Sequence, residues 1–319
     1  MNPRGFVAWA LGRFGPRAAD AVPALARTLH GEDVWARQPA AWALAEIGPK
    51  ARDATDALAR ALGDAGGHGW SAKYDCRYHA ARALAKIGKP ALPTLLERLG
   101  SGESRAAVGA AMALGRMGAD AREAAPALIK ALARGDPFLK AAAAKALAGV
   151  APDGEGVAAA LAAELADSDY GTRQSAARAL GECGPAAAGA LGALRKALND
   201  PRPEVQFAAA EALGKIGKDA VSVLAEVVRS RKDASLRAWC ARALGTAAAH
   251  EEAATARQAL SDALGDRSER VRREAAWALG RLGPRAAGAE AALKKAANDP
   301  DHVVRVAAAA ALRRVHEDE

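Results

Sequence analysis

The sequence predicts an all-α fold: a right-handed α-solenoid of about nine and a half stacked helical hairpins. An Ala-Leu pair recurs ten times along the 319 residues, and in most copies glycine follows the leucine. With the leucine of each copy as the anchor, numbered zero, the anchors are Leu11, Leu44, Leu84, Leu114, Leu147, Leu180, Leu213, Leu244, Leu279 and Leu312. Five of the nine steps between them are 33 residues. A fixed period of this size indicates one supersecondary unit stacked on copies of itself.

Each anchor is predicted to lie in a helix. Before Leu312, Asp299-Pro-Asp301 opens a turn, and an acidic residue there can cap the following helix. Apolar or small residues fall at positions −8, −4, −1, 0 and +3, one face of a helix with 3.6 residues per turn. Glycine at +4 is expected to end the helix as a left-handed cap, at Gly15, Gly48, Gly88, Gly118, Gly184, Gly217 and Gly283. Proline follows directly at Pro16, Pro49, Pro185 and Pro284 and blocks its continuation.

Another helical stretch, such as residues 121–132, separates successive anchor helices. We call it the first helix of a repeat and the anchor helix the second. Proline at matching positions, Pro23, Pro93 and Pro126, is expected to start or kink the first helix. No segment alternates with period two for long enough to indicate a strand. The predicted single domain comprises a half repeat, 1–15, and repeats at about 16–48, 49–88, 89–118, 119–151, 152–184, 185–217, 218–248, 249–283 and 284–319. Steps of 30 and 31 residues predict tighter turns near Lys89 and Lys218.

The repeated phrase resembles the short HEAT-like repeat named after phycobilisome lyases. It is clearest at Val271-Arg-Arg-Glu-Ala-Ala-Trp-Ala-Leu-Gly-Arg-Leu-Gly283 and at Ala209-Ala-Glu-Ala-Leu-Gly-Lys-Ile-Gly217. The Thr-Pro-Leu-His signature of ankyrin repeats is absent, as is the tetratricopeptide pattern. The resemblance covers essentially the whole chain. It implies the fold strongly and function weakly, because such repeats serve many roles.

Composition excludes several classes of protein. The chain is 51% hydrophobic but only 4% aromatic, and its formal net charge of +8 is mild for nucleic-acid binding. Three widely spaced cysteines, Cys76, Cys183 and Cys240, imply no disulfide framework and are consistent with a reducing compartment. No signal-peptide stretch and no 18-residue apolar span is present, so a soluble cytoplasmic protein is expected.

Position −2 of the second helix points away from the buried stripe and marks the candidate binding surface. In α-solenoids this helix usually lines the concave face. Down the repeats the position holds Trp9, Trp42, Arg82, Met112, Lys145, Arg178, Glu211, Arg242, Trp277 and Ala310. Tryptophan interleaved with arginine is typical of hot spots at protein interfaces. The alternative is that these rings lie over alanine-rich grooves and fill space.

A second column is basic. Position −7 reads Arg37, Arg77, Ala107, Lys140, Arg173, Gln206, Arg237, Arg272 and Arg305. Acids recur at position −11, as Asp33, Glu103, Asp136, Asp169, Asp233 and Asp301. One helical turn separates the two columns, so pairing within and between repeats is expected. A paired ladder leaves little field to attract DNA, and nucleic-acid binding is therefore the least favoured function.

The step from Leu44 to Leu84 contains an insertion, residues 63–77. Its glycines and its aromatic and histidine side chains suggest a contact loop on the rim of the concave face, with Trp35 and Trp42 near it. The candidate contact residues there are Trp70, Tyr74 and Tyr78. His68, Asp75, Cys76 and His79 match no zinc spacing, and no phosphate-loop pattern is present. No metal or cofactor is therefore expected, and a solvated loop is the simpler alternative to a ligand site.

These observations favour a non-catalytic scaffold that holds a protein partner in its concave groove. Deoxyhypusine hydroxylase, built from similar repeats, holds iron with His-Glu pairs, and the matching helix starts here carry none. The alternative that the lyase resemblance implies is handling of a chromophore or another cofactor. The helix from Phe6 to Phe14 has no first helix before it, which leaves Phe6, Val7 and Ala10 uncovered. End-to-end stacking through this helix is a further expectation.

Overall fold

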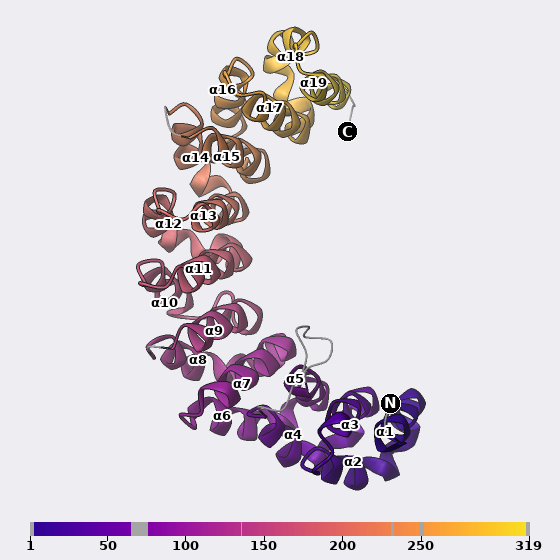
Figure 1. Ribbon diagram of the computed structural model, residues 1–319. Coiled ribbons are helices and arrows are strands. Elements are labelled where there is room, and N and C mark those ends of the chain that lie inside the picture. The colour runs from indigo at the N-terminus through magenta and orange to yellow at the C-terminus, as the bar shows by residue number, and fades with distance from the viewer. Residues whose placement is uncertain (1–2, 65–75, 135, 231–232, 249–251, 317–319) are drawn as a thin grey trace. The chain divides into compact units, whose positions relative to one another are not determined.

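The computed structural model describes residues 3–64, 76–134, 136–230, 233–248 and 252–316, and these residues form helices joined by turns (Figure 1). The chain divides into two compact units, Met1–Val157 and Ala158–Glu319. Within the described residues no segment is a strand, so the predicted all-α class is confirmed. None of the described helices combines the length and hydrophobicity that crossing a lipid bilayer requires.

Unit 1 consists of two layers of helices (Figure 1). One layer holds the second helices, α1 (Pro3–Phe14), α3 (Val34–Ile47), α5 (Cys76–Ile87), α7 (Ser104–Met117) and α9 (Pro137–Val150). The other holds the first helices, α2 (Val22–Thr28), α4 (Thr55–Ala61), α6 (Leu92–Gly100) and α8 (Ala125–Leu132). Successive second helices pack on one another, and from α3 onward each also packs on the first helix of its own repeat.

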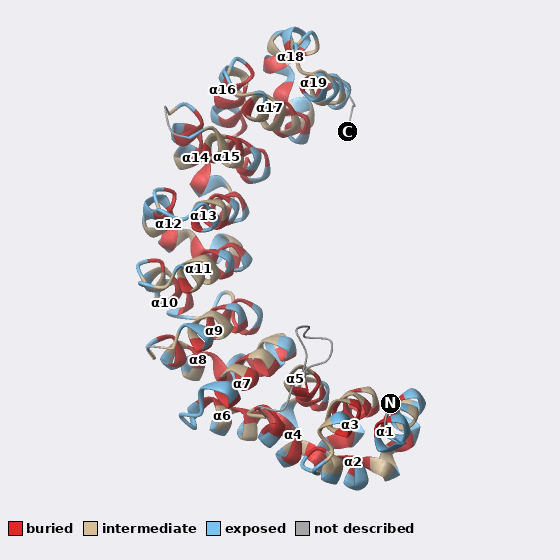
Figure 2. Cartoon of the chain, viewed as in Figure 1, coloured by how far each residue is buried: buried red, intermediate tan, exposed pale blue. Residues whose placement is uncertain are grey.

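Unit 2 repeats this arrangement. Its second helices are α11 (Tyr170–Cys183), α13 (Pro203–Ile216), α15 (Ala234–Ala247), α17 (Glu269–Leu282) and α19 (His302–Val315). Its first helices are α12 (Leu191–Ala197), α14 (Val221–Val228), α16 (Ala253–Ala263) and α18 (Glu290–Ala296), together with α10 (Val157–Glu164), which begins at the last residue of unit 1. In both units the buried residues lie where helices meet, and exposed residues occupy the sides that face away (Figure 2).

The Ala-Leu-Gly motif has a direct packing role. The anchor leucines from Leu44 to Leu279 are completely buried. The glycine at +1 lies against the alanine at −1 of the following second helix. A Cβ added at Gly245 would lie 2.7 Å from both Cα and Cβ of Ala278, and one at Gly181 would lie 2.9 Å from Cα of Ala212. Glycine at this position therefore lets the backbones of neighbouring helices approach closely.

The turns that join each second helix to the first helix of the next repeat are mostly 3₁₀ helices. Five of them span seven residues: η1 (Gly15–Ala21), η2 (Gly48–Ala54), η5 (Gly118–Ala124), η6 (Gly184–Ala190) and η8 (Gly283–Ala289). Two span only three, η4 (Lys89–Ala91) and η7 (Lys218–Ala220), so the tighter turns predicted near Lys89 and Lys218 are confirmed. Pro23, Pro93 and Pro126 lie in the first turns of their helices, where proline's fixed φ suits a helix start.

The glycines at +4 have the positive φ that their position predicts, but they are not left-handed helical caps. Gly283 has φ 57° and ψ −135°, and Gly118 has φ 59° and ψ −137°. This combination is essentially restricted to glycine. It turns the chain directly into the 3₁₀ segment, whereas a left-handed cap would require a positive ψ. The expectation that these glycines have a positive φ was correct, and the expectation of a left-handed cap conformation was wrong.

Candidate partner-binding surface

Positions −9, −2 and +2 of each second helix lie on the side away from the buried stripe, and none of the described residues there is buried. Positions −6 and −5 flank them and are buried in some repeats, as at Ala238 and His79. At 100° per residue the five positions span about 100° of the helix surface. We call this the second-helix face. Of the ten residues at position −2, none is buried, and half are exposed outright: Trp9, Lys145, Arg178, Glu211 and Arg242. The others, including Trp42, Arg82, Met112 and Trp277, are half-buried.

Aromatic side chains cluster on the second-helix face at α1 and α3. The rings of Trp9 and Trp42 stack, with centroids 6.4 Å apart and an interplanar angle of 15°. Phe6 adds a third ring 6.1 Å from Trp9, and the guanidinium of Arg13 lies 5.4 Å from that indole. Trp42 also fills the space beside Gly12, where a Cβ would lie 2.3 Å from the indole. Trp42 therefore packs against α1 and is half-buried, as the space-filling interpretation expects, while a role in binding stays a prediction.

Charged side chains continue the face across α5 and α7. Arg82 pairs with Glu46 at 2.7 Å, and Lys86 approaches the same carboxylate at 3.5 Å. Tyr78 is half-buried, and the guanidinium of Arg116 lies 4.8 Å from its ring. The face of unit 1 thus combines aromatic rings with cations.

Two large side chains at position −9 are the most exposed aromatics of this face. Trp35 is 68% exposed and Phe138 is 79% exposed. Trp35 was a sequence candidate, but Phe138 was missed, because a search along position −2 alone does not reach it. A helical-wheel projection that includes position −9 would have identified it.

In unit 2 the aromatic residues of the face are bound by arginines. Arg242 of α15 and Arg281 of α17 lie 5.3 Å and 5.2 Å from the ring of Trp277. Such cation–π contacts order the arginine side chains.

A second cluster on the same face was missed by the sequence analysis. Trp239 at position −5 lies 5.6 Å from the guanidinium of Arg270 and packs edge-on against Phe207 at 5.4 Å. The signal was available in the sequence, since −5 lies only about 20° from +2 around the helix and borders the same face.

The basic column at −7 forms a ladder, but its partners differ from those expected. Nε and Nη2 of Arg173 donate to the two carboxylate oxygens of Asp200, at 2.7 and 3.0 Å. The same two nitrogens of Arg272 donate to Asp299, at 2.7 and 2.8 Å. These aspartates lie at position −13 of the following repeat. Arg37–Asp64 and Arg237–Asp266 are the equivalent pairs.

The acids at −11 have another role. Asp33, Asp136, Asp169, Asp233 and Asp301 accept hydrogen bonds from backbone N–H groups in the first turns of their own helices. Glu103 makes no such bond. The expected pairing of −7 with −11 is therefore wrong, because the hydrogen bonds of the −7 arginines go to the aspartates at −13. The reason is geometric: −13 lies in the turn that faces the preceding repeat, whereas −11 lies at a helix start where N–H groups need acceptors.

The ladder also connects each turn to its own helix. Arg272 Nη1 donates to the carbonyl of Asp266, six residues before it, while its remaining donors bind Asp299. These side chains are largely buried, 13% and 8% exposed for the Arg272–Asp299 pair. The ladder is thus structural, and Arg173 and Arg272 each use Nε, Nη1 and Nη2 within it.

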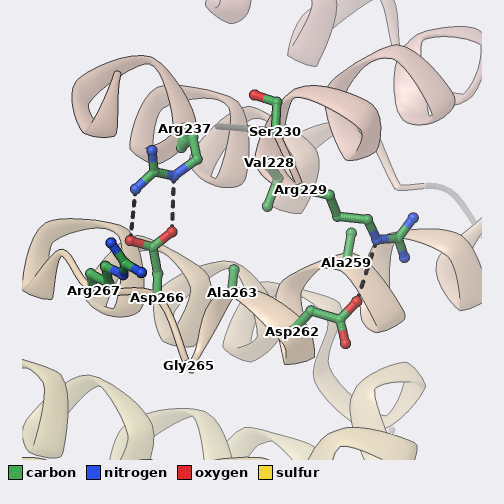
Figure 3. Close-up of a pocket in the computed structure, with 10 residues that line it drawn as sticks. All are labelled: Val228, Arg229, Ser230, Arg237, Ala259, Asp262, Ala263, Gly265, Asp266 and Arg267. Atoms are coloured by element: carbon green, nitrogen blue, oxygen red, sulfur yellow. Dashed lines mark hydrogen bonds and ion pairs between the residues drawn. The ribbon is translucent and has the colours of Figure 1, made fainter. Parts of the chain in front are cut away.

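A pocket of about 670 Å³ lies between the turns around α14, α15 and α16 (Figure 3). Arg237 and Asp266 face each other on one side, and Arg229 pairs with Asp262 at 3.3 Å on the other. Most of the charges that line it are therefore mutually neutralised.

The insertion contributes little that the structure describes. Trp70 and Tyr74 lie outside the described residues, as do His68 and Asp75. Cys76 and His79 are buried in α5, so their side chains pack inward. Within the described ranges, no three His, Cys, Asp or Glu side chains come close enough together to hold a metal ion. Burial, with the charge of Glu182 adding to it, raises the pKa of Cys183 to about 11, so this thiol is protonated at neutral pH.

The side of α1 that faces away from α3 is open. Phe6 and Val7 are each 56% exposed, and a mostly apolar pocket of about 340 Å³ is lined by Val7, Leu11 and Leu25 among others. End-to-end stacking through this surface stays a prediction.

The model of HEAT repeats matches residues 2–67, 71–148, 158–245 and 223–313, which together cover most of the chain. The chain belongs to the HEAT-repeat family. The match is to HEAT repeats in general and does not identify the phycobilisome lyase type. A search of curated proteins finds no match.

Solved structures share the fold. Importin beta matches with a TM-score of 0.57 and 14% identity, over 93% of this chain and 51% of its own. Kap121p matches with a TM-score of 0.61 and 14% identity, over 88% and 36%. An engineered protein is 25% identical over 99% and 95%, with a TM-score of 0.48. The HEAT-repeat chain thus spans about half of importin beta and about a third of Kap121p. The likeness to importin beta and Kap121p, at 14% identity, shows the fold alone.

Proposed function

We propose that this HEAT-repeat chain is a non-catalytic scaffold that binds a protein partner on its second-helix face, the face expected to be concave. The observation that carries the proposal is the concentration of exposed and half-buried aromatic and arginine side chains on this face, in a chain with few aromatics overall. Aromatic and arginine residues dominate the binding energy of protein interfaces.

The proposed contact residues are those that the sequence identified, with the additions from the structure. They are Trp9, Trp35, Trp42, Tyr78, Arg82, Met112, Lys145, Arg178, Arg242 and Trp277, together with Phe138, Trp239, Arg270 and Arg281. Trp70 and Tyr74 remain proposed contacts that lie outside the described residues. Each of these side chains that the structure describes keeps part of its surface open to solvent.

Affinity capture from a lysate of the source cells, with quantitative mass spectrometry, tests the proposal. Trp42→Ala, Arg82→Ala and Trp277→Ala are compared with Lys130→Ala and Lys295→Ala, two exposed residues of the first helices α8 and α18. Truncation of a hot-spot residue costs about 2 kcal/mol or more, so captured partners should fall more than about tenfold with the first set. The control variants should retain them.

Circular dichroism of every variant provides the folding control, because Trp42 also packs against Gly12. Loss of capture with unchanged helical content supports the proposal. Equal capture by all five variants would show that the second-helix face does not bind the partner.

A further inference from the structure

The second-helix face of α15, α17 and α19 carries an unusual set of charges. It holds five arginines and one glutamate, namely Arg242, Arg270, Arg273, Arg281, Arg314 and Glu274. The other acid of α17, Glu269, interacts with Arg272 of the ladder. The face of these three helices therefore has a formal excess of four positive charges.

Most of these arginines have no acidic partner within the ranges that the structure describes. Arg273 pairs with Glu274 at 3.2 Å. Among the residues that the structure describes, Arg242, Arg270, Arg281 and Arg314 form no ion pair, and Arg270 donates one hydrogen bond, to Ser235 at 3.3 Å. The ladder arginines of the same helices, Arg237 and Arg272, each have a bidentate aspartate. The excess charge is thus a property of the face and not of the whole repeat.

The indole rings hold three of these arginines in place. Arg242 and Arg281 contact the ring of Trp277, and Arg270 contacts that of Trp239. A guanidinium that lies over a ring keeps its in-plane N–H donors available, and a side chain that is already ordered loses less entropy on binding. Bidentate binding of a carboxylate is the interaction that such a group fits best.

Exposed aliphatic side chains lie on α19, which packs on α17, the helix that carries three of these arginines. Val303 is 49% exposed and Val306 is 54% exposed, at positions −9 and −6 of the face. The aliphatic side chains of a peptide match these valines, whereas the phosphate backbone of a nucleic acid offers them no apolar partner. Trp277 and Trp239 already contact arginines, so they are poorly placed to stack with bases.

We propose that the second-helix face of α15, α17 and α19 is the docking site for an acidic segment of a partner protein that also carries aliphatic side chains. This inference rests on the proposed scaffold function and specifies the chemistry of its partner in unit 2. Carboxylates bind Arg242, Arg270 and Arg281, and aliphatic side chains pack on Val303 and Val306.

Fluorescence anisotropy with the full chain and short labelled peptides tests the proposal. The probe peptide alternates Glu or Asp with Leu. One control peptide carries Lys in place of the acids, another carries Ser in place of Leu, and an oligothymidylate of similar length replaces the peptide. We expect the acidic–aliphatic peptide to bind tightest, the Ser peptide more weakly and the Lys peptide not at all.

Two double variants, each of which removes two positive charges, test whether the peptide binds at this face. Arg242→Gln with Arg281→Gln should weaken binding of the probe peptide by about tenfold or more, since hydrogen bonds to charged groups are lost. Lys196→Gln with Lys295→Gln removes the same charge from the first helices α12 and α18 and should change it less than about twofold. Val303→Ser with Val306→Ser should weaken it about fivefold.

The proposal fails if the two charge variants weaken binding equally, if oligothymidylate binds more tightly than the peptide, or if the peptide does not bind. The scaffold function is judged separately, by capture with Trp42→Ala and Arg82→Ala in unit 1. If those variants lose the partner while the peptide does not bind, the docking inference is wrong and the scaffold function stands. If capture is also unaffected, both are wrong.

Discussion

Substitution of Gly245 by alanine tests the packing that defines this fold. Gly245 is buried in α15, and the added methyl group would lie 2.7 Å from Cα and Cβ of Ala278 and 3.1 Å from its carbonyl oxygen. Carbon atoms in contact prefer a separation of about 3.5–4.0 Å. Because the obstructing atoms belong to the backbone and to the short side chain of Ala278, no flexible group can move aside. Helices α15 and α17 would have to separate by roughly 1 Å to reach that spacing.

The expected cost follows from two opposing effects. Overpacking of a well-packed core costs about 1–3 kcal/mol. Alanine is a better helix former than glycine by about 1 kcal/mol, which offsets part of that cost. Since the closest contacts include the backbone, we expect the upper part of the range and a net loss of about 1–2 kcal/mol. Ala45 occupies the equivalent position in α3 and is fully buried. A methyl group therefore fits at this position where the spacing between neighbouring second helices allows it.

Urea unfolding followed by circular dichroism measures the difference. Gly192→Ala in α12 is the matched control, because a Cβ added at Gly192 would have no neighbouring atom within 4 Å and the helix should gain up to about 1 kcal/mol. A Gly245→Ala protein as stable as the native protein would refute close backbone approach as the reason for the repeated glycine.

Three further predictions concern single sites. The guanidinium of Arg272 donates to Asp299 and holds the pKa of that carboxyl below its ordinary value, so its contribution to stability is present above the unfolded pKa and is lost as pH falls through the folded one. Asp299→Asn should therefore cost about 1–3 kcal/mol in urea unfolding at pH 7 and progressively less below about pH 4, while Glu204→Gln at an exposed pair should change little; an equal cost at both pH values would contradict this. Thr172 is fully buried, and its hydroxyl has no hydrogen-bond partner among the described residues, so Thr172→Val should raise the free energy of unfolding by about 1–3 kcal/mol, and a loss of stability would show that the hydroxyl is satisfied. Cys183, with its pKa raised to about 11 by burial, should react with iodoacetamide at pH 8 only after denaturation, as mass spectrometry of the native and unfolded protein would show.

Much of the fold could be predicted because its signals are local. The helical period, proline at the starts of first helices and glycine at +4 each act within a few residues, so the hairpins and the short turns at Lys89 and Lys218 follow from the chain itself. The accessibility of one column of the candidate binding surface, position −2, was also predictable. Position −2 faces away from the buried stripe because one helical face is apolar, and this property does not depend on neighbours.

Tertiary structure decided what depends on the next repeat. Arg272 pairs with Asp299 and not with an acid at −11, because the packing of successive repeats brings the following turn, and not the helix start, to the guanidinium. The grouping of Trp239 with Arg270 likewise depends on how α15 and α17 pack side by side. Sequence by itself determined which residues form each helix and which side is apolar, since both are set by rotation along one chain. Which charges are neutralised and which remain open to a partner was decided by distances between side chains that are far apart in sequence.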